Sequence, residues 1–288
     1  DYLLHYQHKI EVTDSATVDG HGCFLHFDRG SSDSDLLDVA DTKLLTLENT
    51  VLRDFDPQRV DLNSTGQIIF GSGSEIDLTQ YIRLADASYT MTFAGEVVIN
   101  GRGGIIDFGG VDHGLEVLSS GTLVINNAKL VGLSGNSLRC DSYDSTLTLS
   151  NCELEMSSNF SFTQGFVNIY GDVAVKGNAK TFTYSSGEML TIASDAQLKF
   201  HDGTTFMYGS DSATNMDLVG ELLMDGATLS LDTDKAFTIA AGKLLINNKV
   251  TINAGSASYP LTFGDDLSLI VSGGSTMDVA SGKVVYGS

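Results

Sequence analysis

Residues 123–130 read LVINNAKL, residues 147–154 read LTLSNCEL, and residues 45–52 read LTLENTVL. All three segments follow the pattern L-x-[LI]-x-N-x-x-L, and the first two begin 24 residues apart. Alternating apolar and polar residues have the period of two that turns one face of a β-strand inward. The pattern therefore predicts short strands that are separated by sharp bends at asparagine.

Longer segments repeat as well. Residues 18–27 and 99–108 each place a G-x-G bend between two apolar runs, and residues 239–246 and 279–286 match at a distance of 40 residues, or two turns of about 20. Antiparallel hairpins give no reason for such a period, whereas a chain that coils back above itself does. We therefore predict an all-β fold, a single-stranded parallel β-helix (a β-solenoid) with about 20–24 residues and three short strands per turn, continuous over residues 1–288. About twelve turns would form a rod of about 55–60 Å.

Some segments depart from the repeat. Residues 28–36, 53–65 and 209–214 contain many polar residues, and we expect them to protrude as loops. Residues 1–12 are expected to form an N-terminal strand, a cap or a segment donated to another copy.

Three asparagines, Asn49, Asn127 and Asn151, occupy the same position of the motif. Asparagine tolerates the left-handed backbone conformation that a sharp bend needs. Asparagine side chains stacked along a rod can also hydrogen-bond to one another. The motif therefore predicts an asparagine ladder at one corner of the coil.

The composition limits the possible partners. The net charge is −21, so nothing here could neutralise a nucleic-acid backbone or favour an anionic membrane surface. No run approaches 18 apolar residues, so we expect no membrane span. The chain does not open with a basic and then apolar segment, so we expect that any signal peptide has been removed and that the protein is extracellular or at the cell surface.

Cys23, Cys140 and Cys152 are an odd, small set that does not form a disulfide framework. Each lies in or beside an apolar run, which favours small buried thiols. A bridge between Cys140 and Cys152 is the alternative.

The repeats make the chain similar in pattern to the right-handed parallel β-helix proteins. This group includes pectate-lyase-like enzymes, autotransporter passenger domains, polymorphic outer-membrane proteins and phage tailspikes. The resemblance covers nearly the whole chain and implies the fold. The family within the group stays open, because Gly103-Gly104-Ile105 lacks the alanine of the G-G-A-[ILV] tetrapeptide found in polymorphic outer-membrane proteins.

Candidate catalytic groups are few. Gly20-His21-Gly22 resembles the G-H-G element of polygalacturonase-type glycosidases, but the paired aspartates and the R-I-K clamp of those enzymes are absent, and Arg102 replaces the histidine in the internal copy. We therefore expect no catalytic role for His21. The negative charge disfavours an acidic polysaccharide and leaves a neutral one open.

Two weaker sets of residues remain. Tyr143, Tyr170, Tyr184 and Tyr208 are candidates to line a sugar groove, with stacking in the interior as the alternative. The weak candidates for a Ca²⁺ site are Asp33, Asp35, Asp38 and Asp41. We expect no other metal and no cofactor.

The ends of the chain suggest an assembly. Neither end contains a recognisable cap, and open strand edges pair with other chains. A head-to-tail contact that does not close gives a filament. The residues expected at these contacts are Tyr2, Leu3, Leu4, Tyr6, Val284, Val285 and Tyr286.

We therefore expect a non-enzymatic structural protein, a subunit of an extracellular filament or surface layer whose partner is a second copy. One alternative is an adhesin or autotransporter-passenger-type surface domain that binds a host or cell-surface glycan or protein. The other is a carbohydrate-active β-helix enzyme, similar to a polysaccharide lyase or hydrolase.

Overall fold

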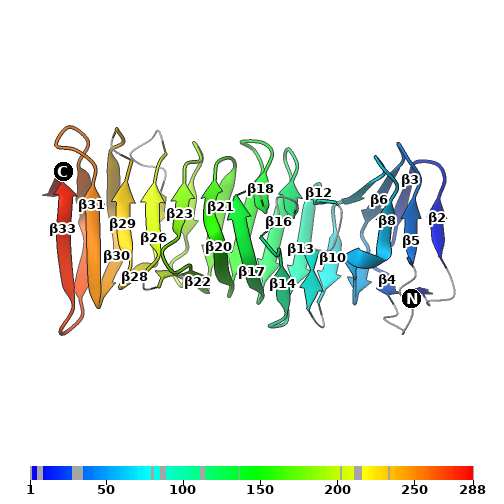
Figure 1. Cartoon of the computed structure of the whole chain (residues 1–288), viewed down its shortest axis with the longest axis horizontal. Coiled ribbons are helices and arrows are strands. Elements are labelled where there is room, and N and C mark those ends of the chain that lie inside the picture. The colour runs from blue at the N-terminus through cyan, green and yellow to red at the C-terminus, as the bar shows by residue number, and fades with distance from the viewer. Residues whose placement is uncertain are drawn as a thin grey trace.

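The computed structural model is a rod in which the chain coils through about 11 turns (Figure 1). It describes residues 2–4 (backbone only), 9–27, 35–78, 81–84, 89–110, 114–135, 137–201, 203–210, 216–232 and 234–287. Strands make up 61% of the chain, and the pairs between the named strands are parallel. The predicted fold class, a parallel β-solenoid, is confirmed. No helix in the described ranges is long and apolar enough to cross a membrane.

Four parallel sheets form the sides of the rod, here named A to D. Sheet A contains, in spatial order, β1 (Tyr2–Leu4), β4 (Phe24–Phe27), β7 (Val51–Arg53), β10 (Ser74–Asp77), β13 (Glu96–Asn100), β16 (Thr122–Asn126), β19 (Thr146–Ser150), β21 (Phe166–Tyr170), β24 (Leu190–Ile192) and β27 (Met216–Leu218). Sheet B contains β2 (Ile10–Val12), β5 (Leu37–Val39) and β8 (Val60–Leu62). Sheet C contains β3 (Ala16–Asp19), β6 (Leu44–Glu48), β9 (Gln67–Phe70), β12 (Met91–Phe93), β15 (Leu115–Val117) and β18 (Leu138–Cys140).

Sheet D covers the rest of the rod and divides at β20 (Glu153–Phe162). The strands that lead to β20 are β11 (Ile82–Arg83), β14 (Ile105–Asp107) and β17 (Lys129–Gly135). One branch contains β22 (Asp172–Lys176), β25 (Gln197–Phe200), β28 (Glu221–Asp225), β30 (Phe237–Asn247), β32 (Leu261–Val271) and β34 (Val284–Tyr286). The other contains β23 (Thr181–Tyr184), β26 (Thr205–Tyr208), β29 (Thr228–Leu231), β31 (Lys249–Ala254) and β33 (Thr276–Gly282).

Equivalent apolar residues lie above one another along the rod axis. Ile99 pairs with Ile125, Ile125 with Leu149, and Leu149 with Ile169. These four side chains are buried because each points inward between buried neighbours in the turns above and below. The predicted stacking of matched leucine positions is therefore confirmed for Leu123 and Leu147, which pair in adjacent strands.

The length of a turn varies more than the sequence predicted. Leu147 pairs with Val167, 20 residues later, whereas Ala16 pairs with Leu45, 29 residues later. The longer spacing arises in the turn that contains the predicted loop at 28–36. Extra residues between strands are tolerated there because the strands themselves keep their pairing.

Aromatic side chains fill the interior of the N-terminal half. The Phe27 ring lies 5.1 Å from that of Phe55, Phe55 lies 5.5 Å from Phe70, and Phe70 lies 5.4 Å from Phe93. All four side chains have no exposed surface. Edge and stacked contacts at these distances add to the free energy gained by burying the rings.

The prediction that residues 53–65 protrude as a loop was wrong for most of that segment. It contains the 3-10 helix η1 (Pro57–Arg59), capped by the side chain of Asp56, and strand β8, which pairs with β5. Phe55 is fully buried. The polar residues that suggested a loop alternate with buried ones, so the segment is part of the wall.

The other irregular segments are only partly described. Residues 28–34 and 211–214 lie outside the described ranges, while Leu36 and Ser210 at their borders are buried. In residues 1–12, β1 pairs with β4 and β2 pairs with β5, so both strands add to sheets of their own chain.

Candidate functional site

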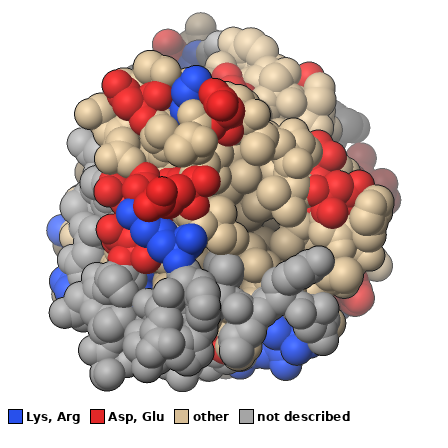
Figure 2. Space-filling view, turned by 90° about the vertical axis from the view of Figure 1, so that its right-hand side faces the viewer, with Lys and Arg blue, Asp and Glu red and all other residues tan. Residues whose placement is uncertain are grey.

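The N-terminal end of the rod is hollow and apolar. Figure 2 views this end and shows a hollow with a mostly uncharged surface and acidic side chains on two sides; Glu11 and Asp14 belong to its lining. The cavity has a volume of about 540 Å³. Its apolar lining comes from β2 to β6 and consists of Ile10, Val12, Ala16, Val18, Leu25, Leu37, Leu45 and Leu47. They occupy inward-facing positions, and residues at the same positions in turns further from this end are buried.

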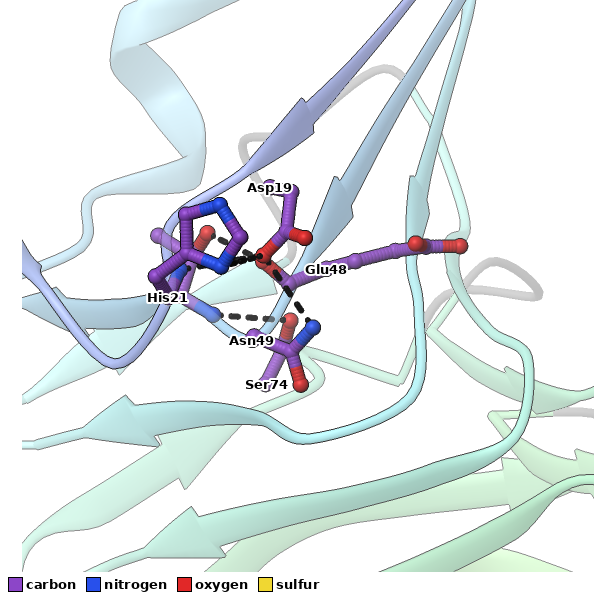
Figure 3. Close-up of polar contacts among 6 residues, drawn as sticks. Asp19, His21, Glu48, Asn49 and Ser74 are labelled. Carbon is purple, nitrogen blue, oxygen red and sulfur yellow. Dashed lines mark hydrogen bonds and ion pairs between the residues drawn. The ribbon is translucent and has the colours of Figure 1, made fainter.

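Charged and polar groups hold the rim of this end together. Asp19 lies between two neighbours (Figure 3): its Oδ1 atom accepts a hydrogen bond from the backbone N–H of His21 at 3.0 Å and one from the Asn49 amide at 3.1 Å. Both hydrogen bonds lower the pKa of Asp19, and the one from the His21 backbone has the larger effect. On the same rim, Lys43 pairs with Asp14 at 3.3 Å.

The His21 side chain is 83% exposed, and its Nδ1 atom lies 3.5 Å from Asp19. Its backbone φ of 48° closely matches the 51° of Arg102 in the internal copy. Both residues therefore occupy the same kind of bend, and the G-x-G pattern is explained by turn geometry. Two carboxylates come from neighbouring strands here, since Asp19 is in register with Glu48. In Figure 3 the Asp19 carboxylate lies beside His21, whereas the Glu48 side chain extends away from it, so the two do not face each other as the pair in a glycosidase does.

The opposite end of the rod exposes residues that are in register with the core. Val279 pairs with Ile252, and Tyr286 pairs with Phe263. Ile252 and Phe263 are buried, whereas Val279 is 42% exposed and Tyr286 is 63% exposed. The turn formed by β32, β33 and β34, which lies at the C-terminal end of the rod (Figure 1), therefore presents apolar side chains along the rod axis.

The predicted assembly residues lie at these two ends. Tyr2, Leu3 and Leu4 form β1, the edge strand of sheet A, and Val284, Val285 and Tyr286 form β34, an edge of sheet D. Tyr6 lies outside the described residues.

The predicted calcium residues have other partners where the structure describes them. Asp38 pairs with Lys9 at 2.7 Å and accepts a hydrogen bond from Asn63. Asp41 accepts a bond from the backbone N–H of Thr65 at 3.2 Å. Asp35 is partly exposed, and Asp33 lies outside the described residues. Across the described part of the chain, no three histidine, cysteine or acidic side chains are grouped so as to hold a metal ion.

The three asparagines that were predicted to share one corner of the coil lie at two different corners. Asn127 and Asn151 follow the paired strands β16 and β19, between sheets A and D, whereas Asn49 follows β6, between sheets C and A. All three have positive φ, from 47° to 53°, so the prediction of sharp left-handed bends is confirmed. The prediction of a single ladder was wrong, because the same strand–Asn–strand motif occurs at two different corners of the coil.

The four candidate tyrosines divide into two pairs. Tyr184 and Tyr208 are fully buried, and their rings stack at 6.4 Å inside the rod. Tyr143 and Tyr170 are 61% and 47% exposed. Period-two alternation within each strand places Tyr184 and Tyr208 inward, and it places Tyr170 outward, next to the buried Ile169 of β21.

Comparison of the chain with protein-family models, curated proteins and solved structures gave no match.

Proposed function

We propose that the protein is a non-enzymatic structural subunit of an extracellular filament or surface layer, in which copies stack head to tail along the rod axis. The observation that supports this most directly is the exposed apolar face of the β32–β34 turn. Val271 is 46% exposed there, although its partner Ile246 in the turn below is buried.

The hollow N-terminal end is the complementary surface. Its apolar lining and the open edges of β1, β2 and β3 face away from the turns that follow. A copy placed on this end would continue the same parallel pairing, with strands about 4.8 Å apart. Such a contact joins different surfaces and does not close, so it propagates as a filament.

Apolar burial would supply the driving force. Fully burying one large apolar side chain contributes about 1.5–3 kcal/mol, whereas association costs about 4–15 kcal/mol in lost freedom. Stacking therefore needs several side chains at once. Leu267, Leu269, Met277 and Val284 are partly buried in the β32–β34 turn and would add to Val271 and Val279.

Negative-stain microscopy and analytical ultracentrifugation of the purified chain test the proposal. We expect rods several times longer than one subunit, and we expect Val279→Asp to leave single subunits because it places a charge in the apolar contact. The matched control is Val219→Asp, since Val219 is 53% exposed at a bend on the side of the rod. This variant should assemble like the wild type.

A sharp monomer at high concentration of the wild-type protein would refute head-to-tail stacking. Equal assembly of the two aspartate variants would place the contact elsewhere. Release of sugars from a panel of polysaccharides would contradict the non-enzymatic part of the proposal.

A further inference from the structure

The outer face of sheet A carries no charged residue over four consecutive turns. The chain contains 37 acidic and 16 basic residues, yet the outward positions of β16, β19, β21 and β24 are all neutral. Charge returns on the flanking strands, with Glu96 on β13 and Asp217 on β27. We name this surface the sheet A platform; it consists of Thr122, Val124, Asn126, Thr146, Thr148, Ser150, Phe166, Asn168, Tyr170 and Thr191.

Two aromatic side chains stand on this platform. Phe166 and Tyr170 alternate with the buried Val167 and Ile169 of β21, so both point outward. Tyr170 is 47% exposed and Phe166 is partly exposed. Four residues along a strand separate the two by about 13 Å.

Neutral hydrogen-bonding groups surround the two rings. Asn168 lies between them and is in register with Thr191 on one side and, on the other, with Thr148, which is only 9% exposed. Tyr170 is in register with Ser150, and Phe166 with Thr146. Within the described ranges, the Asn168 amide is not occupied by a hydrogen bond to another residue. It can therefore donate to and accept from a ligand.

We propose that the sheet A platform binds an uncharged polysaccharide chain, laid along β21. A sugar ring has an apolar C–H face that packs on an aromatic ring and a rim of hydroxyls that bonds to amides and hydroxyls. Because the two residues are about 13 Å apart along the strand, their rings contact different sugar residues of one chain.

Charge selects against other polymers. The net charge of −21 repels acidic polysaccharides and nucleic acids. The platform has no carboxylate to pair with a basic partner. A flat surface encloses little of its ligand, so the two stacking contacts would provide a large share of the affinity.

Affinity electrophoresis in native gels tests the proposal, with a β-1,3-glucan, hydroxyethyl cellulose, a galactomannan and the acidic polygalacturonate as probes. The Val279→Asp background keeps the protein from stacking, so the result does not depend on filament formation. If Val279→Asp does not prevent assembly, binding is measured below the concentration at which assembly starts. We expect at least one neutral polymer to retard the protein and polygalacturonate to leave it unaffected.

Variants locate the binding on the platform. Tyr170→Ala should weaken binding about tenfold or more, the effect of losing one stacking contact, whereas Tyr170→Phe should retain it. The control is Tyr259→Ala, a tyrosine of similar exposure (42%) in another turn. Asn168→Asp keeps the side-chain shape but adds a charge, and it should weaken binding while Asn178→Asp, at an exposed bend on sheet D, does not.

The proposal is overturned if none of the neutral polymers binds, if polygalacturonate binds as well as they do, or if Tyr170→Ala and Tyr259→Ala behave alike. Circular dichroism and thermal melting of each variant separate lost binding from lost structure.

Discussion

At the residue scale, Cys140 and Cys152 show how burial controls reactivity. Both are free thiols and are only 4% and 3% exposed, whereas Cys23 is exposed. Burial raises the pKa of Cys140 to about 12 and also raises that of Cys152. Because the thiolate is the nucleophile, neither buried cysteine should react at neutral or mildly alkaline pH.

We therefore predict that iodoacetamide at pH 8 modifies Cys23 in the native protein and all three cysteines only after denaturation, as counted by intact-mass spectrometry. The raised pKa of each buried thiol stabilises the folded state at pH values below the pKa that the thiol has in the unfolded chain. This contribution to stability is lost as the pH rises from the unfolded-state pKa through the folded-state pKa. A denatured, unreduced sample that takes up a single label would instead reveal a Cys140–Cys152 bridge.

The asparagine bends mark what a single residue can and cannot predict. Positive φ at Asn49 and Asn127 follows from local chemistry, so the sequence motif predicted it correctly. Their different corners depend on how many strands precede each bend within its turn. That number is set by non-local pairing, which a motif of eight residues does not contain.

At the element scale, the 53–65 segment shows the limit of reading polarity as a loop signal. Period-two alternation identified the long strands, because their buried rows are regular. β8 is three residues long and follows η1, so its alternation is too short to stand out. Likewise, the sheet A platform could not be predicted, since its neutral residues come from four strands whose mutual register only the structure defines.

Phe55 provides a test of that element. The side chain is fully buried between Phe27 and Phe70, so we predict that Phe55→Ala lowers the free energy of unfolding of the N-terminal turns by about 3–5 kcal/mol, through lost burial and the cavity left behind. Urea unfolding followed by circular dichroism measures this. Tyr143→Ala, at a site 61% exposed, should change it little. Equal stability of the two variants would contradict the packed structure of residues 53–65 and support the loop that the sequence suggested.

At the scale of the whole molecule, the negative charge opposes the stacking that the apolar ends favour. Glu11 and Asp14 lie at the N-terminal end, and Asp266 and Asp278 lie on the β32–β34 turn. Stacking brings these like charges together. Salt shortens the range of their repulsion, from about 10 Å at 0.1 M to about 3 Å at 1 M ionic strength, while it leaves apolar burial in place.

Filament growth should therefore accelerate with salt, and light scattering at 0.02 M and 0.5 M sodium chloride measures the difference. If charge at the contact is the cause, Asp278→Asn should assemble faster at low salt and respond less to added salt. Asp195→Asn removes the same charge from an exposed bend on the side of the rod and should keep the wild-type response. An identical gain from both variants would mean that net charge, and not charge at the stacked ends, sets the rate.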